Sequence, residues 1–318
     1  MHDEPLIFIG DGDAVCEASL LFLPRRIDAV RNHASGVVYE EGADYTVHVA
    51  SGRLTRPPTS RMPCVPLHAL ATDDGRFMHQ RLVSVTYAHD APAPMPPPSP
   101  ALRAALERTH TRLGRGEPVT ICLVGDSISE GYDASGFHAV PPHQPPYASL
   151  VATSLEQHHG GPVRLHNLAV AGGSAADGRW LTAETAATEP DLVVVAYGMN
   201  DAGWADAGKF VANVSAIASD VRRARPQAEV LLVASMRPTP LCHWVVAERF
   251  SQYRDALIDL AARAGVGVAD VTTAWDLLLS RKSPFDLTAN GLNHPNDFGH
   301  RIHAQTILAC LPPHLPRT

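Results

Sequence analysis

Short apolar runs alternate with amphipathic segments over the second half of the chain. Five runs rich in β-branched residues predict buried strands, at residues 119–124, 163–168, 192–196, 230–234 and 266–269. One segment between them carries apolar residues at helical spacing, namely Phe210, Val214, Ile217 and Val221. This alternation predicts an α/β fold: a five-stranded parallel, doubly wound, flavodoxin-like sheet with helices on both faces. Right-handed crossovers would place the carboxyl ends of all five strands at one edge.

The first 90 residues show a different pattern, without a helical period. Short apolar runs at 18–23, 36–39, 45–49 and 82–87 are separated by Gly, Asp and Pro. Residues 37–49 resemble a hairpin with residues 41–44 in its turn. The region is therefore predicted to be a small antiparallel β-sandwich of jelly-roll type.

A proline-rich segment separates the two patterns. Residues 91–100 read Ala-Pro-Ala-Pro-Met-Pro-Pro-Pro-Ser-Pro, a composition that forms neither helix nor sheet and acts as a stiff spacer. We therefore predict an N-terminal domain at 1–90, a linker at 91–100 and a larger α/β domain at 101–318, which opens with a helix over 101–113. The N-terminal domain is predicted to fold by itself, because such a spacer lets few contacts cross.

Composition and charge narrow the function classes. The chain has 318 residues, a net charge of −7 and a pI of about 6.2, which argue against nucleic acid as a partner. Five scattered cysteines suggest free thiols in a reducing compartment rather than a zinc site. The N-terminus lacks the pattern of a signal peptide, and no apolar run has the length of a membrane span. These features predict a cytoplasmic protein that binds neither membrane nor nucleic acid, and they leave a homo-oligomer open.

Ser127 is the first candidate for chemistry. Gly125-Asp126-Ser127 follows directly after the first strand of the sheet, where Gly125 permits a sharp turn into a helix. The N-terminus of that helix favours negative charge, and open α/β sheets bind their ligands at this edge. Taken alone, such a serine is more often an ordinary helix N-cap.

Three later stretches also follow predicted strands. Asn167 to Gly172 comes after the second strand, Gly198-Met199-Asn200-Asp201 after the third, and His294-Pro295 well after the fifth. Each has a simpler explanation as a turn or a loop residue. Together with Ser127 they supply a nucleophile, oxyanion donors and a base, which are the parts of acyl transfer.

These four blocks resemble those of the SGNH (GDSL) hydrolases over residues 117–310. The resemblance implies that Ser127 is the nucleophile and His294 the base. It also implies an oxyanion hole formed by the backbone N–H groups of Ser127 and Gly172 and by the side-chain amide of Asn200. Gly172 is expected to let its backbone approach the reacting carbon closely. Asp126 and Asp201 are expected to fix the loops rather than to react. The nucleophile elbow of α/β-hydrolases is excluded, because Ser129 stands where that motif has glycine.

The chain departs from the family pattern at the third catalytic position. The family has an Asp three residues before the histidine, and here that residue is Gly291. A backbone carbonyl near Gly291, giving a Ser–His dyad, is favoured. Asp286 in that role and no third member at all remain open. Asp297 is predicted to cap the last helix.

No metal or organic cofactor is expected. His300 and His303 lie close to His294 in sequence, but no acidic residue completes a ligand set at the usual spacing. Both histidines are therefore predicted to be core or surface residues.

The predicted function is hydrolysis of short-chain esters, with acetyl favoured, on a carbohydrate. The residues 131–136 and 144–147, with the N-terminal β-sandwich, are similar to those of bacterial carbohydrate esterases. The proline-rich loop 140–146 suits a small acyl pocket. A lysophospholipase or thioesterase of the same fold is the alternative enzyme. A carbohydrate-binding protein with a decayed hydrolase domain is the other alternative, and the presence of Ser127, Asn200 and His294 counts against it.

Overall fold

The computed structural model describes residues 1–11, 15–72, 74–91 and 104–311. Its central sheet has five parallel strands in the order β11-β10-β9-β7-β8. They are β7 (Val119–Gly125), β8 (Val163–Asn167), β9 (Leu192–Ala196), β10 (Glu229–Ala234) and β11 (Gly267–Asp270). All five predicted strands are present, so the α/β fold class is confirmed.

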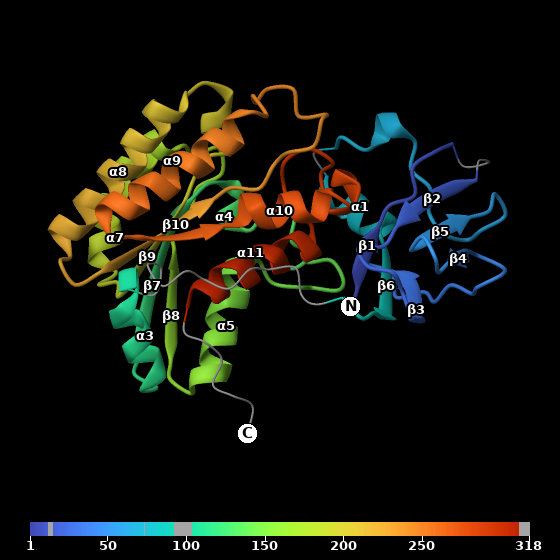
Figure 1. Ribbon diagram of the computed structural model, residues 1–318, viewed down its shortest axis with the longest axis horizontal. Coiled ribbons are helices and arrows are strands. Elements are labelled where there is room, and N and C mark those ends of the chain that lie inside the picture. Colours follow the sequence, from blue (N-terminus) through green and yellow to red (C-terminus); the bar gives the residue numbers. More distant parts are fainter. Residues whose placement is uncertain (12–14, 73, 92–103, 312–318) are drawn as a thin grey trace.

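Helices cover both faces of this sheet (Figure 1). The longer ones are α5 (Tyr147–His159), α8 (Ala207–Ala224), α9 (Arg249–Ala264), α10 (Val271–Leu279) and α11 (Asp297–Cys310). The shorter ones are α3 (Glu107–Gly114), α4 (Ser127–Glu130), α6 (Ala175–Gly178), α7 (Thr182–Ala187) and the 3-10 turns Arg179–Leu181, Asp201–Gly203 and Pro284–Asp286. Helices α8 and α9 lie on one face, and α5 and α11 on the other.

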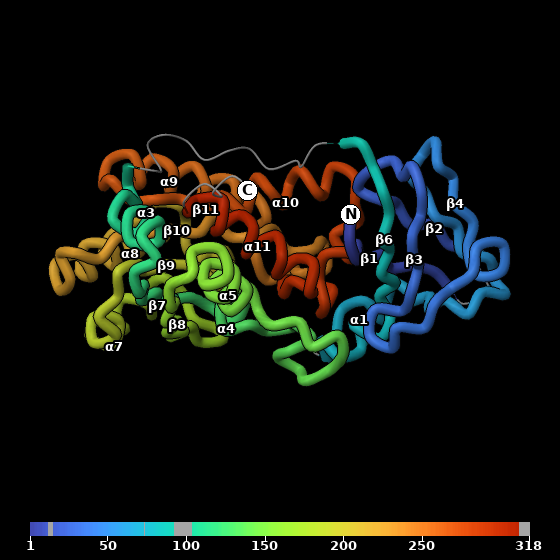
Figure 2. The backbone as a smooth tube through the Cα atoms, turned by 90° about the horizontal axis from the view of Figure 1, so that it is seen from below, coloured from blue at the N-terminus to red at the C-terminus, as the bar shows by residue number. Residues whose placement is uncertain are grey.

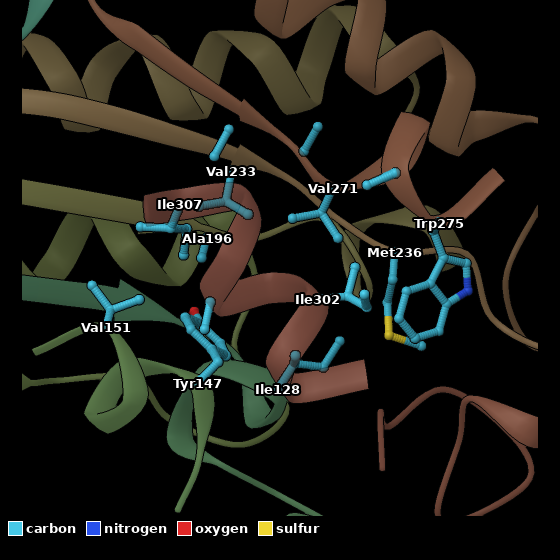
Figure 3. Packing of buried hydrophobic residues seen from close by; sticks show 14 of the residues in the cluster. Ile128, Tyr147, Val151, Ala196, Val233, Met236, Val271, Trp275, Ile302 and Ile307 are labelled. Atoms are coloured by element: carbon cyan, nitrogen blue, oxygen red, sulfur yellow. The ribbon is translucent and has the colours of Figure 1, made fainter. Parts of the chain in front are cut away.

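Helix α8 shows how the sequence builds one of these layers. Asp206 caps its first turn by accepting a hydrogen bond from the Lys209 amide at 2.7 Å. The predicted apolar stripe is buried against the sheet and α9, while the opposite face is polar. On the other face, Figure 3 shows side chains of α5 and α11 meeting those of the strands, among them Tyr147, Ile307, Ala196 and Val233. The core therefore extends through both helix layers.

The N-terminal region consists of two three-stranded antiparallel sheets, as the predicted sandwich requires. Their orders are β1-β6-β3 and β2-β5-β4. The elements are β1 (Glu4–Leu6), β2 (Cys16–Ser19), β3 (Arg26–Asn32), β4 (Thr46–His48), β5 (Arg53–Arg56), the 3-10 turn Leu67–Ala69, α1 (Gly75–Arg81) and β6 (Val83–Ala88).

The predicted hairpin over residues 37–49 is wrong. Strand β4 pairs instead with β5, through a turn that ends at Gly52 with φ +67°. The first half of the predicted hairpin pairs with β3, because the Val37 carbonyl accepts the Asn32 amide at 2.8 Å and the Tyr39 amide donates to the Val30 carbonyl at 2.9 Å. Asp44 from the predicted turn is held by Arg61, with its carboxylate also accepting the Glu40 amide at 2.9 Å. This ties residues 40–44 to a later loop rather than to a hairpin partner.

Contacts between the N-terminal region and the rest of the chain are numerous. The ammonium of Lys282 lies 2.7 Å from the carboxylate of Glu4, and both side chains are 0% exposed. Asp286 accepts the amide of Ile7 at 2.7 Å, and the Thr72 amide donates to the Asn290 carbonyl at 3.0 Å. The expectation that few contacts cross is therefore wrong, and Figure 2 shows the N-terminal sheets packed against the rest of the molecule. The stiff spacer and the start of the helix predicted over 101–113 fall on residues 92–103, outside the described residues.

Among the helices of the described ranges, none combines the length and the apolar character that crossing a bilayer requires.

Replacing Lys282 should test how strongly the two parts hold together. Lys282→Ala leaves Glu4 and Asp286 buried without their cation, so the free energy of unfolding should fall by about 3–5 kcal/mol in urea denaturation. Arg53→Ala is the control, because the Arg53–Glu17 pair is half exposed and should contribute no more than about 1 kcal/mol. Equal losses in the two variants would contradict this account.

Candidate active site

The structure brings Ser127 and His294 together at the carboxyl edge of the sheet. Ser127 opens α4 directly after β7, and His294 lies in the loop before α11. Ser127 Oγ and His294 Nε2 are 2.8 Å apart, which is hydrogen-bond distance. The two residues are 167 positions apart in the sequence, so only the fold makes this pair.

The turn around Ser127 explains the residues on either side of it. A side chain at Gly125 would collide with Ser129 Oγ and the Ala196 carbonyl. Asp126 is the N-cap of α4 and accepts the Ile128 amide at 3.0 Å, as expected for a residue that fixes the loop. Burial raises the pKa of Asp126 to about 7. Because Asp126 supplies the cap, the hydroxyl of Ser127 faces His294 instead.

The other ring nitrogen of His294 contacts Asp133. Its Nδ1 lies 2.9 Å from Asp133 Oδ2, and the second carboxylate oxygen lies 2.5 Å from His138 Nε2. Asp133 has a left-handed backbone with φ +65°, and its carbonyl accepts His79 Nε2 at 3.0 Å. Burial alone would raise the pKa of Asp133, but the hydrogen bonds from His294 and His138 outweigh it and lower that pKa. The carboxylate is thus ionised at neutral pH.

Neither of the third members considered from the sequence contacts the imidazole. The Asp286 carboxylate lies with Ile7 and Lys282, and the Gly291 carbonyl accepts Thr239 Oγ1 at 2.6 Å. The favoured Ser–His dyad is therefore wrong as a description of this geometry. Gly291 is needed for another reason: its φ is +65°, and the Leu70 carbonyl occupies the place of a Cβ.

The predicted oxyanion residues lie in loops tied to the same edge. Gly172 has φ +79°, whereas a Cβ there would meet no atom within 4 Å. The glycine therefore permits this backbone conformation, and the close approach to the reacting carbon stays a prediction. The Ala171 amide donates to Glu130 Oε2 at 2.7 Å, which joins this loop to α4. Asn200 Nδ2 donates to the Gly173 carbonyl at 2.8 Å, and its amide carries a second N–H for a ligand.

Comparison with known proteins identifies the family. A model of the GDSL-like lipase/acylhydrolase family matches residues 123–302, more than half of the chain. The chain belongs to this family. It is accordingly a carboxylic ester hydrolase. No curated protein matches the chain.

Solved structures share the GDSL fold at low identity. Axe2, an acetylxylan esterase from Geobacillus stearothermophilus, has a TM-score of 0.51 at 20% identity, over 63% of this chain and 95% of that one. A two-domain esterase active on acetylated mannans has a TM-score of 0.52 at 21% identity, over 65% of this chain. This chain covers 52% of that esterase, about half its length. A putative GDSL-like lipase from Parabacteroides merdae has a TM-score of 0.52 at 15% identity, over 60% and 94% of the two chains.

Two further histidines that lie near His294 in the sequence are core residues, as predicted. His300 Nε2 donates to the Tyr132 carbonyl at 3.1 Å, and His303 Nδ1 donates to the Gly299 carbonyl at 2.9 Å. Burial lowers the pKa of each to about 4, so both are neutral at physiological pH.

The expected cap of α11 is wrong in its residue. Asn296 is the N-cap and accepts the Gly299 amide at 3.1 Å. The neighbouring Asp297 carboxylate instead accepts the Ser135 amide at 2.8 Å and contacts His33. Asp201 fixes its loop as expected, by accepting the Ala175 amide, and burial raises its pKa to about 6.

The buried His303 should make stability depend on pH. In the unfolded chain the pKa of this histidine is about 6.5, whereas in the folded protein it is about 4. Between these two pH values, protons therefore bind mainly to the unfolded state and favour unfolding. Wild type therefore loses stability on acidification that His303→Gln does not lose. In urea denaturation, the free energy of unfolding of wild type minus that of His303→Gln should fall by about 2 kcal/mol from about pH 7 to about pH 5. A constant difference would mean that the histidine is not held neutral.

Proposed function

We propose that this protein is a serine esterase that removes short acyl groups, acetyl foremost, from carbohydrates. The observation that carries the proposal is the continuous chain of hydrogen bonds from Ser127 through His294 to Asp133, at 2.8 and 2.9 Å. A nucleophile, a base on it and a buried carboxylate on the base form the arrangement that activates serine in acyl transfer.

The first half of the reaction forms an acyl-enzyme. Ser127 Oγ attacks the ester carbonyl carbon while His294 Nε2 takes the hydroxyl proton. Asp133 accepts the Nδ1–H of His294, which fixes the tautomer and stabilises the imidazolium that forms. When the C–O bond of the ester breaks, Nε2 returns the proton to the leaving alcohol. Water then repeats the steps on the acyl-enzyme and releases the acid.

Negative charge on the carbonyl oxygen needs donors at the same edge. The backbone N–H groups of Ser127 and Gly172 and the amide of Asn200 are the proposed donors. The bonds from Ala171 to Glu130 and from Asn200 to Gly173 hold two of the three loops in register with α4. Loss of one such donor typically lowers turnover by about 10²–10³.

A short acyl group is favoured by the loop after Asp133. In this loop, the side chain of Gln144 donates from Nε2 to the Asp297 carbonyl at 2.6 Å. The backbone N–H of Gln144 donates to Ser135 Oγ at 2.8 Å. The loop is therefore fastened to the start of α11 beside His294. Tyr132 packs against His294 and Phe137, with ring centroids at 5.4 and 4.6 Å. A fixed aromatic wall suits a small acyl pocket better than an adaptable groove for a long chain.

A carbohydrate as the alcohol is supported by exposed tryptophans. Trp180, Trp204 and Trp244 are 83%, 46% and 48% exposed, and they follow β8, β9 and β10 at the edge that holds Ser127. Indole faces pack well against the C–H faces of sugar rings, and exposed aromatic residues mark binding surfaces. Axe2 and the two-domain esterase, which share the fold, are described as acting on acetylated xylan and mannan.

A series of nitrophenyl esters from acetyl to palmitoyl should separate the candidate functions. We expect the highest kcat/KM on acetyl and a steep fall with chain length. Ser127→Ala serves as the background control. A preference for long chains would favour a lysophospholipase or thioesterase, and no turnover by wild type would favour a binding protein.

Asparagine substitutions should identify the carboxylate that matters for His294. Asp133→Asn removes the charge that orients and stabilises the imidazole, so turnover should fall by about 10³–10⁴ with the fold retained. Asp286→Asn is the matched comparison, since that buried carboxylate does not touch His294 and should change turnover per folded molecule by less than about tenfold. Circular dichroism checks folding of both. The reverse order of effects would return the role to Asp286.

A further inference from the structure

Two histidines and an aspartate from distant segments meet beside the candidate active site. His33 follows β3, His79 lies in α1 and Asp297 is the first residue of α11. One ring nitrogen of each histidine and one carboxylate oxygen of Asp297 all lie within 4.8 Å of one another. The side chains of His33 and Asp297 are 8% and 2% exposed, and His79 is fully buried.

Each of these three side chains has one polar atom that is bonded to a residue outside the cluster. His33 Nδ1 lies 2.8 Å from Ser84 Oγ, His79 Nε2 donates to the Asp133 carbonyl at 3.0 Å, and Asp297 Oδ1 accepts the Ser135 amide at 2.8 Å. The remaining atoms are His33 Nε2 and Asp297 Oδ2, which contact each other, and His79 Nδ1. Metal-binding histidines are held in this way, with the second nitrogen bonded to a carbonyl, a carboxylate or another polar group.

His79 Nδ1 gives independent evidence for a ligand. It is a buried polar atom that has no hydrogen-bond partner in the described part of the chain. Burying such an atom without a partner costs free energy, and native proteins rarely tolerate it. The facing pair, His33 Nε2 and Asp297 Oδ2, is 3.0 Å apart and does not include it. A cation between the three atoms would satisfy all of them.

We propose that His33, His79 and Asp297 bind one divalent transition-metal ion, with zinc the best match. Two imidazole nitrogens and one carboxylate oxygen are a common zinc ligand set, and water can fill a fourth position. Zinc binds such atoms at about 2.0–2.2 Å in a tetrahedron, so two ligands of one ion lie about 3.3–3.6 Å apart. His33 Nε2 and Asp297 Oδ2, at 3.0 Å, already lie near that spacing, and any wider pair within the 4.8 Å cluster would have to close onto the ion.

The ion would join the N-terminal region to the candidate catalytic loops. Its ligands come from β3, α1 and α11, and His79 also holds the carbonyl of Asp133. The proposed role is therefore structural, fixing Asp133 and the start of α11 rather than contacting the ester. It would replace the sequence-based expectation of no metal.

Metal titration of the full chain tests the site. Protein stripped with a chelator should bind one equivalent of Zn²⁺, and its unfolding temperature should rise with free Zn²⁺. His33→Gln and Asp297→Asn should abolish both effects. His158→Gln is the control for surface binding, because His158 is an exposed histidine beside a second histidine, and this variant should bind like wild type. No stoichiometric binding by wild type, or unchanged binding in both ligand variants, would overturn the proposal.

X-ray absorption on zinc-loaded wild type gives a test that does not depend on the variants folding. We expect a shell of nitrogen and oxygen atoms at about 2.0–2.2 Å, with outer scattering from two imidazoles. A shell of water oxygens alone would mean adventitious metal and would overturn the assignment. Both measurements are independent of esterase activity, so they stand even if the proposed function fails.

Discussion

The hydrogen bonding of the buried Asp133 carboxylate to His294 and His138 is the interaction on which the candidate site depends. The carboxylate is buried, and it remains charged because His294 and His138 both bond to it. A buried charge that lost these partners would be costly, so the loops that carry them must stay in place. The carboxylate is linked to Ser127 through His294, and the backbone carbonyl of Asp133 bonds to His79 of the N-terminal region. One residue thereby links the strand β7 loop, the loop before α11 and helix α1.

The N-terminal region is integral to that arrangement. Leu70 places its carbonyl where the side chain of residue 291 would stand, so the position used by the family for its acid is closed to any residue but glycine. The buried Glu4–Lys282–Asp286 group also joins the N-terminal region to the segment before residue 291. A carboxylate brought from the loop after α4 then contacts His294. The packing of the N-terminal region thus explains why this chain departs from the family pattern at residue 291.

The same loop connects the proposed chemistry with the proposed substrate. Tyr132, next to Asp133, packs against the imidazole of His294, Phe137 packs against Tyr132, and Gln144 fastens the segment to α11. The carboxylate proposed to orient His294 and the proposed wall of the acyl pocket therefore belong to one segment of the chain. Changes in this segment should alter selectivity and turnover together.

The sequence by itself determined the parts that rest on local patterns. The β-branched runs and the helical stripe from Phe210 to Val221 specify the parallel sheet, because burial and periodicity act over neighbouring residues. Ser127, Gly172, Asn200 and His294 each come after a predicted strand, so the sequence predicts that they lie at one edge of the sheet. The tertiary structure alone decided the partner of His294, since Asp133 is 161 residues away and carries no spacing signal. For the same reason it alone placed the glycine at 291 and the three-residue cluster of His33, His79 and Asp297: each depends on backbone from distant segments meeting in space.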